Sequence, residues 1–380
     1  MEVELSMEEN QKKWAEETLA KVERKLAKVS DRSADKIPYT TTEGVHDDRS
    51  GDIGWWTNGF WGGMMWQMYT LTGEEKYRRI AEDNERKLDA CLMDYGKLDH
   101  DNGFKWLPTA VADYRVTGNA ASKNRGLLAA GNLAGRYNNK GCFIRAWNEW
   151  GEDDHRGWAI IDCMMNLPLL YWASEETTDP RFRQIAMSHA DTAAKAFVRG
   201  DGSVNHIVEF DLETGEMVKS YGGQGYGTGS SWTRGQAWGL YGFTLSFLHT
   251  KKELYLDTAE RIANYFIANI PENGLIPVDF RQPPEVSWQD STAAAIAACG
   301  LIELSKLREG RQGSIYLNAA LKLLRALSEH SVNWNEGEDN LLEKCTAAYH
   351  EEVHEFSIIY GDYYFLEALM KLNEKELFIW

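Results

Sequence analysis

Helical periodicity recurs along almost the whole chain. Apolar residues return at three- and four-residue spacing in one segment after another, which predicts amphipathic helices. An apolar segment rich in small residues is followed, after a short turn, by a more charged one, so we expect helical hairpins. The predicted helices span residues 8–29, 59–72, 74–93, 105–116, 120–136, 162–174, 180–197, 233–250, 252–269, 290–306, 314–331 and 361–372.

A repeated pattern supports this pairing. The second helix of several pairs opens with an aromatic residue followed four positions later by alanine, so both lie on one helix face. Such hairpins build either an open solenoid or a closed ring, and about twelve helices in six pairs would close a ring. Residues 206–221 alternate instead like a β-hairpin. The aromatic–alanine pairs are Tyr77/Ala81, Phe182/Ala186, Tyr255/Ala259 and Tyr316/Ala320.

Composition narrows the class of protein. Hydrophobic residues make up 43% of the chain and no linker divides it, which predicts one domain over residues 1–380. The first residues lack the features of a secretory signal, and no apolar run reaches the length of a membrane span. Five scattered cysteines indicate reduced thiols and a cytoplasmic location. The net charge of −17 makes nucleic acids and anionic membranes poor partners.

Fifteen tryptophans are unusual for a chain of 380 residues. They either fill the core or form broad faces against which sugar rings lie. The loops that enter the apolar helices hold most of the glycine, tryptophan, aspartate and histidine. If these loops meet at one end of a ring, they form an aromatic-walled cavity, the expected place for a ligand.

Two acids in these loops are candidates for chemistry. Asp101 lies in a glycine-containing turn before a helix, and Asp162 follows apolar residues at the start of a helix. Each also has an ordinary explanation, because Asp-Asn-Gly is common in turns and aspartate is a common helix cap. Their shared position on one rim favours a catalytic pair.

The glycine-rich stretch 222–238 presents further polar candidates: Gln224, Arg234 and Trp238. It lacks the Gly-Lys-Ser/Thr ending of a phosphate loop. His206 is either a ligand-facing donor or a surface histidine. His350 and His354 have no third ligand nearby in the sequence, so we expect no metal site. No serine–histidine or cysteine–histidine motif indicates a nucleophile.

Together these residues resemble the unsaturated glucuronyl hydrolases of glycoside hydrolase family 88, across essentially the whole length. The order and spacing of the matching motifs make the resemblance specific. The motifs are Trp56-Thr-Asn-Gly-Phe-Trp61, Leu98-Asp-His-Asp-Asn-Gly-Phe104, Ile161-Asp-Cys163 with Asn166-Leu-Pro-Leu-Leu170, Ser231-Trp-Thr-Arg-Gly-Gln-Ala-Trp-Gly-Leu-Tyr-Gly242, Asp290-Ser-Thr-Ala293 and Gly361-Asp-Tyr-Tyr-Phe-Leu-Glu-Ala-Leu369.

The resemblance implies an all-α fold, an (α/α)6 barrel, that works without metal or cofactor. It implies that Asp162 is the catalytic acid and base and that Asp101 is the second essential carboxylate. The implied substrate is a small oligosaccharide, such as a disaccharide, that ends in an unsaturated uronic acid, bound by a monomer or weak homodimer. The implied substrate-binding residues are Trp56, Trp147, His206, Gln224, Arg234 and Trp238.

The chain departs from the family pattern at two places. Many members have histidine before the glutamine that matches Gln224, whereas this chain has Gly223. Members that favour sulfated substrates carry a Ser/Lys cluster before Gly-Asp-Tyr-Tyr, whereas this chain has acids there, among them Glu351, Glu352 and Glu355. These acids would repel a sulfate, which predicts non-sulfated disaccharides as substrates.

Three other functions remain open at this point. An unsaturated rhamnogalacturonyl hydrolase would use the same barrel on pectin fragments. A sugar epimerase would need paired histidines, for which only His206 and His100 are suitably placed. A non-catalytic carbohydrate-binding protein would explain the tryptophans but not the paired acids.

Overall fold

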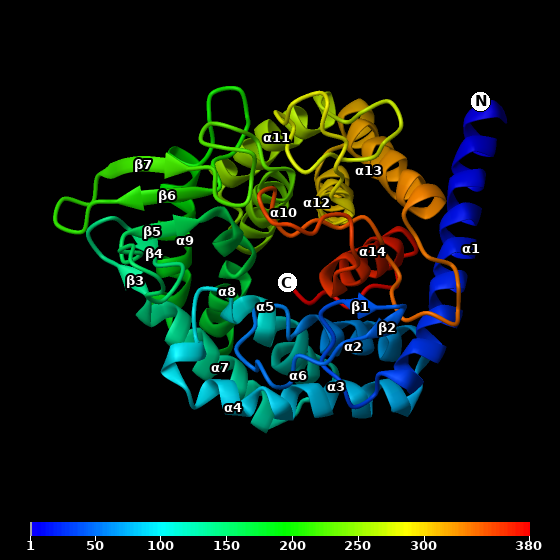
Figure 1. Ribbon diagram of the computed structural model, residues 1–380, viewed down its shortest axis with the longest axis horizontal. Coiled ribbons are helices and arrows are strands. Elements are labelled where there is room, and N and C mark those ends of the chain that lie inside the picture. Colours follow the sequence, from blue (N-terminus) through cyan, green and yellow to red (C-terminus); the bar gives the residue numbers. More distant parts are fainter. Residues whose placement is uncertain (1) are drawn as a thin grey trace.

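The structure, a computed structural model, describes residues 2–380 as a double ring of helices (Figure 1). Each inner helix except the last, α14, leads through a short turn into an outer helix, so these inner helices run in the same direction. The inner ring consists of α2 (Phe60–Thr72), α5 (Asn102–Trp106) with its continuations η2 (Leu107–Val111) and α6 (Ala112–Thr117), α8 (Leu167–Thr177), α10 (Thr233–Thr250), α12 (Ser291–Leu307) and α14 (Ile359–Leu372).

The outer ring covers the inner one. Its first helix, α1, packs beside the last inner helix, α14, so that segments from the two ends of the chain close the ring. The outer helices are α1 (Glu2–Arg32), α3 (Glu75–Lys87), α7 (Ala120–Gly135), α9 (Pro180–Ala196), α11 (Glu253–Ala268) and α13 (Gly310–His330). The expected (α/α)6 barrel is confirmed.

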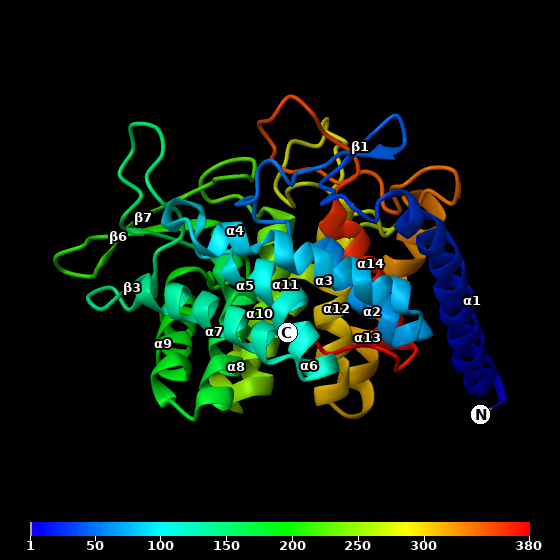
Figure 2. The same ribbon diagram turned by 90° about the horizontal axis from the view of Figure 1, so that it is seen from below.

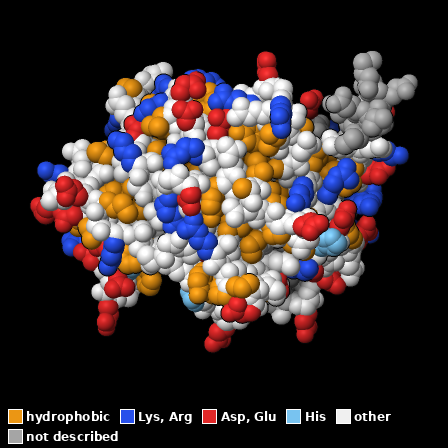
Figure 3. Space-filling model, turned by 90° about the horizontal axis from the view of Figure 1, so that it is seen from above, with side chains coloured by type: hydrophobic (Ala, Val, Ile, Leu, Met, Phe, Trp, Pro, Cys, Tyr) orange, Lys and Arg blue, Asp and Glu red, His pale blue; other side chains and the backbone are white. Residues whose placement is uncertain are grey.

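Burial explains why the inner segments lack a polar face. Every residue from Ser291 to Leu304 of α12 is buried, as is every residue from Thr233 to Phe247 of α10. A helix enclosed by neighbours on all sides has no use for a polar stripe. The outer helices α3 and α13 are amphipathic, with one buried face and one charged face. On the side of the barrel shown in Figure 3, Lys and Arg are interspersed with Asp and Glu.

Long loops gather at one end of the barrel, at the top of Figure 2, together with β1, and β3, β6 and β7 lie at the left of that view. The predicted hairpin is present, and a strand that the alternation did not predict, β5, pairs with it to give a three-stranded antiparallel sheet in the order β5-β6-β7. The strands are β1 (Thr41–Thr42), β2 (Val45–His46), β3 (Tyr137–Asn138), β4 (Phe143–Ile144), β5 (Trp158–Ile160), β6 (Ile207–Phe210) and β7 (Met217–Tyr221).

Several helix boundaries differ from those expected. The segment predicted as one helix over 74–93 breaks at Leu88 into α3 and a short α4 (Asp89–Leu92), and η1 (Tyr95–Lys97) follows. The helix predicted from residue 162 begins as a 3-10 turn, η3 (Ile161–Met165), before α8. No helix among residues 2–380 is long and apolar enough to cross a bilayer.

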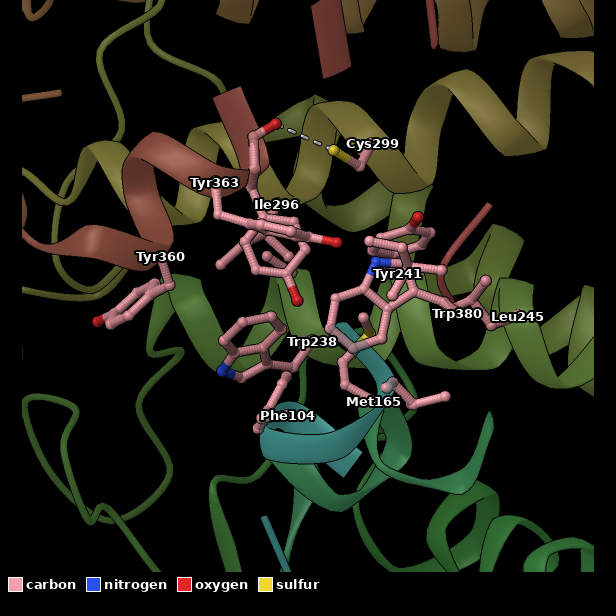
Figure 4. Close-up of a cluster of buried hydrophobic side chains, with 14 of the residues drawn as sticks. Phe104, Met165, Trp238, Tyr241, Leu245, Ile296, Cys299, Tyr360, Tyr363 and Trp380 are labelled. Carbon is pink, nitrogen blue, oxygen red and sulfur yellow. Dashed lines mark hydrogen bonds between the residues drawn. The ribbon is translucent and has the colours of Figure 1, made fainter. Parts of the chain in front are cut away.

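The last residues close the far end of the barrel. Trp380 is fully buried, stacks on Tyr364 at 5.8 Å and meets the edge of Phe104 at 6.0 Å (Figure 4). Its indole N–H donates to Glu367, and Arg115 donates to the carbonyls of Phe378 and Ile379. At this end the barrel interior is therefore filled with side chains.

Candidate active site

An aromatic floor lies where the inner helices begin. Trp238 of α10 is fully buried, with its ring centroid 5.1 Å from Phe104 and 6.4 Å from Tyr360 (Figure 4). Trp56, in the loop before α2, is half-buried and lies 4.9 Å from Tyr360 and 5.4 Å from Phe104. The sequence-predicted Trp56 and Trp238 are thus brought together through two rings that were not predicted as part of the site.

Asp162 stands just beyond the end of β5, at the start of η3. Its side chain is only 16% exposed, and its Oδ1 has no hydrogen-bond partner within the described chain. Burial raises the pKa of this carboxyl to about 7, although the positive charge of Arg234 opposes the shift. Asp162 can therefore hold a proton near neutral pH, as a general acid requires.

His206 faces this carboxyl across a short gap. Its Nε2 lies 3.6 Å from Oδ1 of Asp162, and its Nδ1 accepts the backbone N–H of Gln224 at 3.0 Å. The ring proton therefore sits on Nε2, toward the acid. Burial lowers the pKa of His206 to about 3, so the ring is neutral and presents a donor rather than a charge.

Gly223 makes this arrangement possible. Its backbone has a φ of +56°, and a Cβ at this position would lie 1.9 Å from Nδ1 of His206. No side chain fits there unless the histidine moves. Gly223, which stands where many family members have histidine, therefore leaves the room that His206 occupies.

Asp101 lies at the start of α5, the neighbouring inner helix. Burial raises its pKa well above the usual value, and the negative charges of Asp99 and Asp162 add to the shift. Oδ1 of Asp101 accepts the side-chain N–H of Asn166 at 3.3 Å. Nε2 of His100 lies 3.4 Å from the same oxygen. Each acid thus faces a buried histidine.

Asn166 joins the two acid-bearing loops. Its Nδ2 also donates to the backbone carbonyl of Asp162 at 3.3 Å, and its Oδ1 accepts the N–H of Phe104 at 2.9 Å. The residue was noted in the sequence only as part of a motif. Its position four residues after Asp162, on the same helical face, is the signal that would have placed it beside the acid.

Arg234 is fully buried beneath the rim and holds loops together. Its guanidinium donates to Asp290 at 2.7 Å and to the carbonyls of Thr346 and Ala347, and it lies 4.4 Å from the ring of Trp232. Its charge still acts on Asp162 and lowers that pKa. The role in substrate binding that the resemblance implies stays a prediction.

The remaining predicted residues line the rim. Gln224 is half-buried, and its carbonyl accepts the N–H of Tyr349 at 2.8 Å. Trp147, also half-buried, packs on a small cluster around Trp158 and Ile160, next to Asp162 in the chain. Gln224 and Trp147 therefore come from two different loops, one bonded through its backbone to His206 and the other packed on β5 just before Asp162.

Other reactive side chains near the site are already occupied or buried. His350 and His354 each bind a backbone carbonyl, that of Tyr226 and that of Tyr349, both at 2.9 Å. Cys163, beside Asp162, is buried, which raises the pKa of its thiol. Among residues 2–380, no group of three or more His, Cys, Asp or Glu side chains is arranged to hold a metal ion.

The fold and this site define the class: an (α/α)6-barrel carbohydrate-active enzyme with paired carboxyls over an aromatic floor. The chain belongs to Glycosyl Hydrolase Family 88, whose model matches residues 29–376.

Similar proteins bear this out. The chain is 38% identical over 326 residues to the unsaturated glucuronyl hydrolase of Bacillus sp. (strain GL1), covering 84% of this chain and 86% of that protein. It is 36% identical over 332 residues to the unsaturated chondroitin disaccharide hydrolase of Streptococcus pneumoniae (strain ATCC BAA-255 / R6), covering 86% and 83%. The crystal structure of the unsaturated glucuronyl hydrolase from Streptococcus agalactiae superposes with a TM-score of 0.87 at 33% identity, covering 97% of this chain and 94% of that one.

Proposed function

We propose that this chain is an unsaturated glucuronyl hydrolase. It removes the 4,5-unsaturated uronic acid from the non-reducing end of small glycosaminoglycan-type oligosaccharides by hydrating the C4=C5 double bond. The observation that carries the proposal is the buried carboxyl of Asp162, which holds its proton up to a pH of about 7 and faces a neutral imidazole.

The chemistry needs one group that acts first as an acid and then as a base. The C4=C5 bond is an enol ether conjugated to a carboxylate. Protonation of C4 by Asp162 gives an oxocarbenium-like centre at C5, and Asp162, now ionised, takes a proton from the water that adds there. The resulting hemiketal opens and releases the next sugar. An ordinary glycosidase would instead protonate the leaving oxygen and act at C1.

The other side chains support this chemistry. The neutral His206 is suited to orient Asp162 or a substrate oxygen by donating from Nε2. Asp101, tied to the same loop through Asn166, is suited to bind sugar hydroxyls. Positive charge for the substrate carboxylate comes from Arg234 and from the N-terminal ends of the inner helices, which counter the net charge of −17.

The test is the ultraviolet absorbance of an unsaturated, non-sulfated chondroitin or hyaluronan disaccharide mixed with the protein. The proposal predicts loss of the enol-ether band together with release of the amino sugar. Asp162→Asn should abolish turnover and still bind the disaccharide, because the amide keeps the shape of the carboxyl. An Asp162→Asn protein that still turns over the substrate would overturn the assignment of the acid.

The same assay tests substrate choice. Glu351, Glu352 and Glu355 lie in the segment that contacts the Gln224 loop through Tyr349, and they are exposed. Their charge should slow sulfated disaccharides, so faster turnover of a sulfated disaccharide would contradict this preference. An unchanged spectrum would call for the same test on unsaturated rhamnogalacturonan fragments. Binding without product on either substrate would favour a non-catalytic binding protein.

We further propose that the chain acts as a single catalytic domain in the cytoplasm, as a monomer or weak homodimer. All five cysteines are free thiols, which suits a reducing compartment. The site residues described above come from one chain, so activity should be independent of protein concentration. Cell fractionation and sedimentation velocity test these points.

A further inference from the structure

One face of the β5-β6-β7 sheet leads outward from Asp162. Residues two apart in a strand share a face, so Trp158 and Ile160 of β5 point to the same side. Asp162 follows Ile160 by two residues, where the chain has turned into η3. Ile160 pairs with Ile207 of β6, which pairs with Tyr221 of β7. Trp158, Ile160 and Ile207 are buried together as a small apolar cluster apart from the main core.

Trp147 and Tyr221, both partly buried, pack against this cluster. Tyr221 lies 4.7 Å from Trp158, and Trp147 lies 6.2 Å from it. The result is a path of aromatic side chains along the sheet, on the strand whose last residue, Ile160, is two residues before the proposed acid. Trp158 precedes Asp162 by four residues, so the rise of an extended strand puts it no more than about 13 Å along the chain from the acid.

The path ends in an exposed tryptophan. Trp150 lies in the long loop between β4 and β5, on the same end of the barrel as the other site loops (Figure 2), and is 58% exposed. Its ring is stacked on that of His155 at 4.6 Å with an interplanar angle of 15°, and it lies 6.1 Å from Trp147. His155 in turn meets Trp158 edge-on at 4.5 Å.

The stacking of Trp150 on the buried ring of His155 holds the tryptophan in place. The histidine is fully buried, and neither ring nitrogen has a hydrogen-bond partner within residues 2–380; only Glu149 comes near, at 3.9 Å. A buried polar ring without partners costs free energy, and here the ring lies flat beneath the tryptophan face. An indole fixed with one face to solvent, at the end of an aromatic path, is suited to receive the apolar face of a sugar.

We propose that Trp150, supported by His155, is an outer sugar-binding platform that receives a ring beyond the disaccharide. The inference rests on the proposed function and narrows its substrate: among unsaturated oligosaccharides longer than two sugars, those with a neutral third sugar are preferred over glycosaminoglycan fragments. Trp147 borders the inner part of the path and Trp150 its outer part.

Charge selects the kind of sugar that fits. The loop carries four acids at positions 149 and 152–154. Glu149 pairs with Arg145 at 2.6 Å and Asp154 with Arg156 at 2.7 Å. Glu152 and Asp153 have no such pair in the described chain and are exposed, so they leave the platform net negative. A second uronate or a sulfate is repelled there, and a neutral sugar is not.

The experiment compares three unsaturated substrates by the same absorbance assay. They are a non-sulfated disaccharide, a tetrasaccharide whose other sugars are all neutral, and a tetrasaccharide with a uronate as its third sugar. The platform predicts the highest kcat/KM for the neutral tetrasaccharide. Trp150→Ala should lower kcat/KM for that substrate by about threefold to tenfold, mainly through KM, and leave the disaccharide unchanged.

Matched variants keep the result specific. Trp150→Phe retains an aromatic face and should keep most of the preference. Leu128→Ala, which removes another exposed apolar side chain from the outer helix α7, should change nothing. Equal losses on disaccharide and neutral tetrasaccharide, or no loss on either, would overturn the platform while the proposed function stands. Wild-type protein inactive on all three substrates would overturn the proposed function, and the platform with it.

Discussion

Replacing Asp162 by asparagine is expected to stabilise the fold at neutral and alkaline pH. A buried carboxyl whose pKa is raised from 3.8 to about 7 must ionise against its surroundings once the pH exceeds that value. The unfolded chain ionises it freely from a pH of about 4. Between these values the folded state binds more protons than the unfolded state, so the contribution of Asp162 to stability falls as the pH rises. Asparagine carries no such cost.

The magnitude follows from the shift. A difference of about three pKa units corresponds to about 4 kcal/mol of unfolding free energy, which is the full cost of ionising Asp162 above pH 7. This is an upper figure, because the side chain retains some solvent contact. A chain of 380 residues unfolds with an entropy of about 0.8 kcal/mol/K, so the variant should melt up to about 5 °C higher at pH 8. Below pH 4 the two proteins should melt together, because the acid is protonated in both states.

The assay is thermal unfolding of both proteins between pH 4 and pH 9. Other buried acids with raised pKa values, such as Glu85 and Asp362, affect both proteins alike and cancel in the difference. The expected result is a gap that opens between pH 4 and pH 7 and is then constant. A gap that does not depend on pH, or a variant less stable at pH 8, would refute the claim that Asp162 is held protonated by burial.

Three further predictions concern activity. If the protonated form of Asp162 is the acid, kcat/KM should fall about tenfold per pH unit above pH 7, which initial rates would show. Gly223→Ala should force His206 away from the acid, lower turnover at least about tenfold and cost roughly 2 kcal/mol of stability. Gly227→Ala is the control: a Cβ there meets nothing within 4 Å, so neither turnover nor stability should change. Asn166→Ala leaves a buried backbone N–H without a partner and should cost about 1–3 kcal/mol and lower kcat more than it raises KM. Denaturant titration and steady-state kinetics separate these effects, and a fully active Gly223→Ala protein would contradict the argument from geometry.

The fold was predictable because its signal is local and repeated. Helices such as α12 are apolar on all sides, and the aromatic–alanine pairs mark the outer helices, so hairpin repetition was visible without tertiary information. The strand β5 was missed because it has only three residues, and its partner β6 is far away in the chain. The pairing of α1 with α14 joins opposite ends of the sequence, which periodicity cannot reveal.

The site was predictable in its residues but not in their partners. Asp101 and Asp162 stood out by context, yet the bridge through Asn166 depends on two loops meeting in space. Arg234 was expected to point to a ligand. In the structure its guanidinium donates hydrogen bonds to Asp290 and to two backbone carbonyls. Nothing in the sequence singled out Trp150 except that it is a tryptophan, because its proposed role depends on the ring of His155 stacked beneath it.

The central claim is that water adds across C4=C5 and that cleavage at C1 is not part of the enzyme's chemistry. An unsaturated disaccharide analogue in which a CH2 group replaces the glycosidic oxygen tests this directly, because it keeps the enol ether and offers no bond for a glycosidase to break. Wild-type protein should remove the ultraviolet band of the analogue, and the Asp162→Asn protein should not. An unchanged band, under conditions in which the natural disaccharide is consumed, would contradict hydration and place the chemistry at C1.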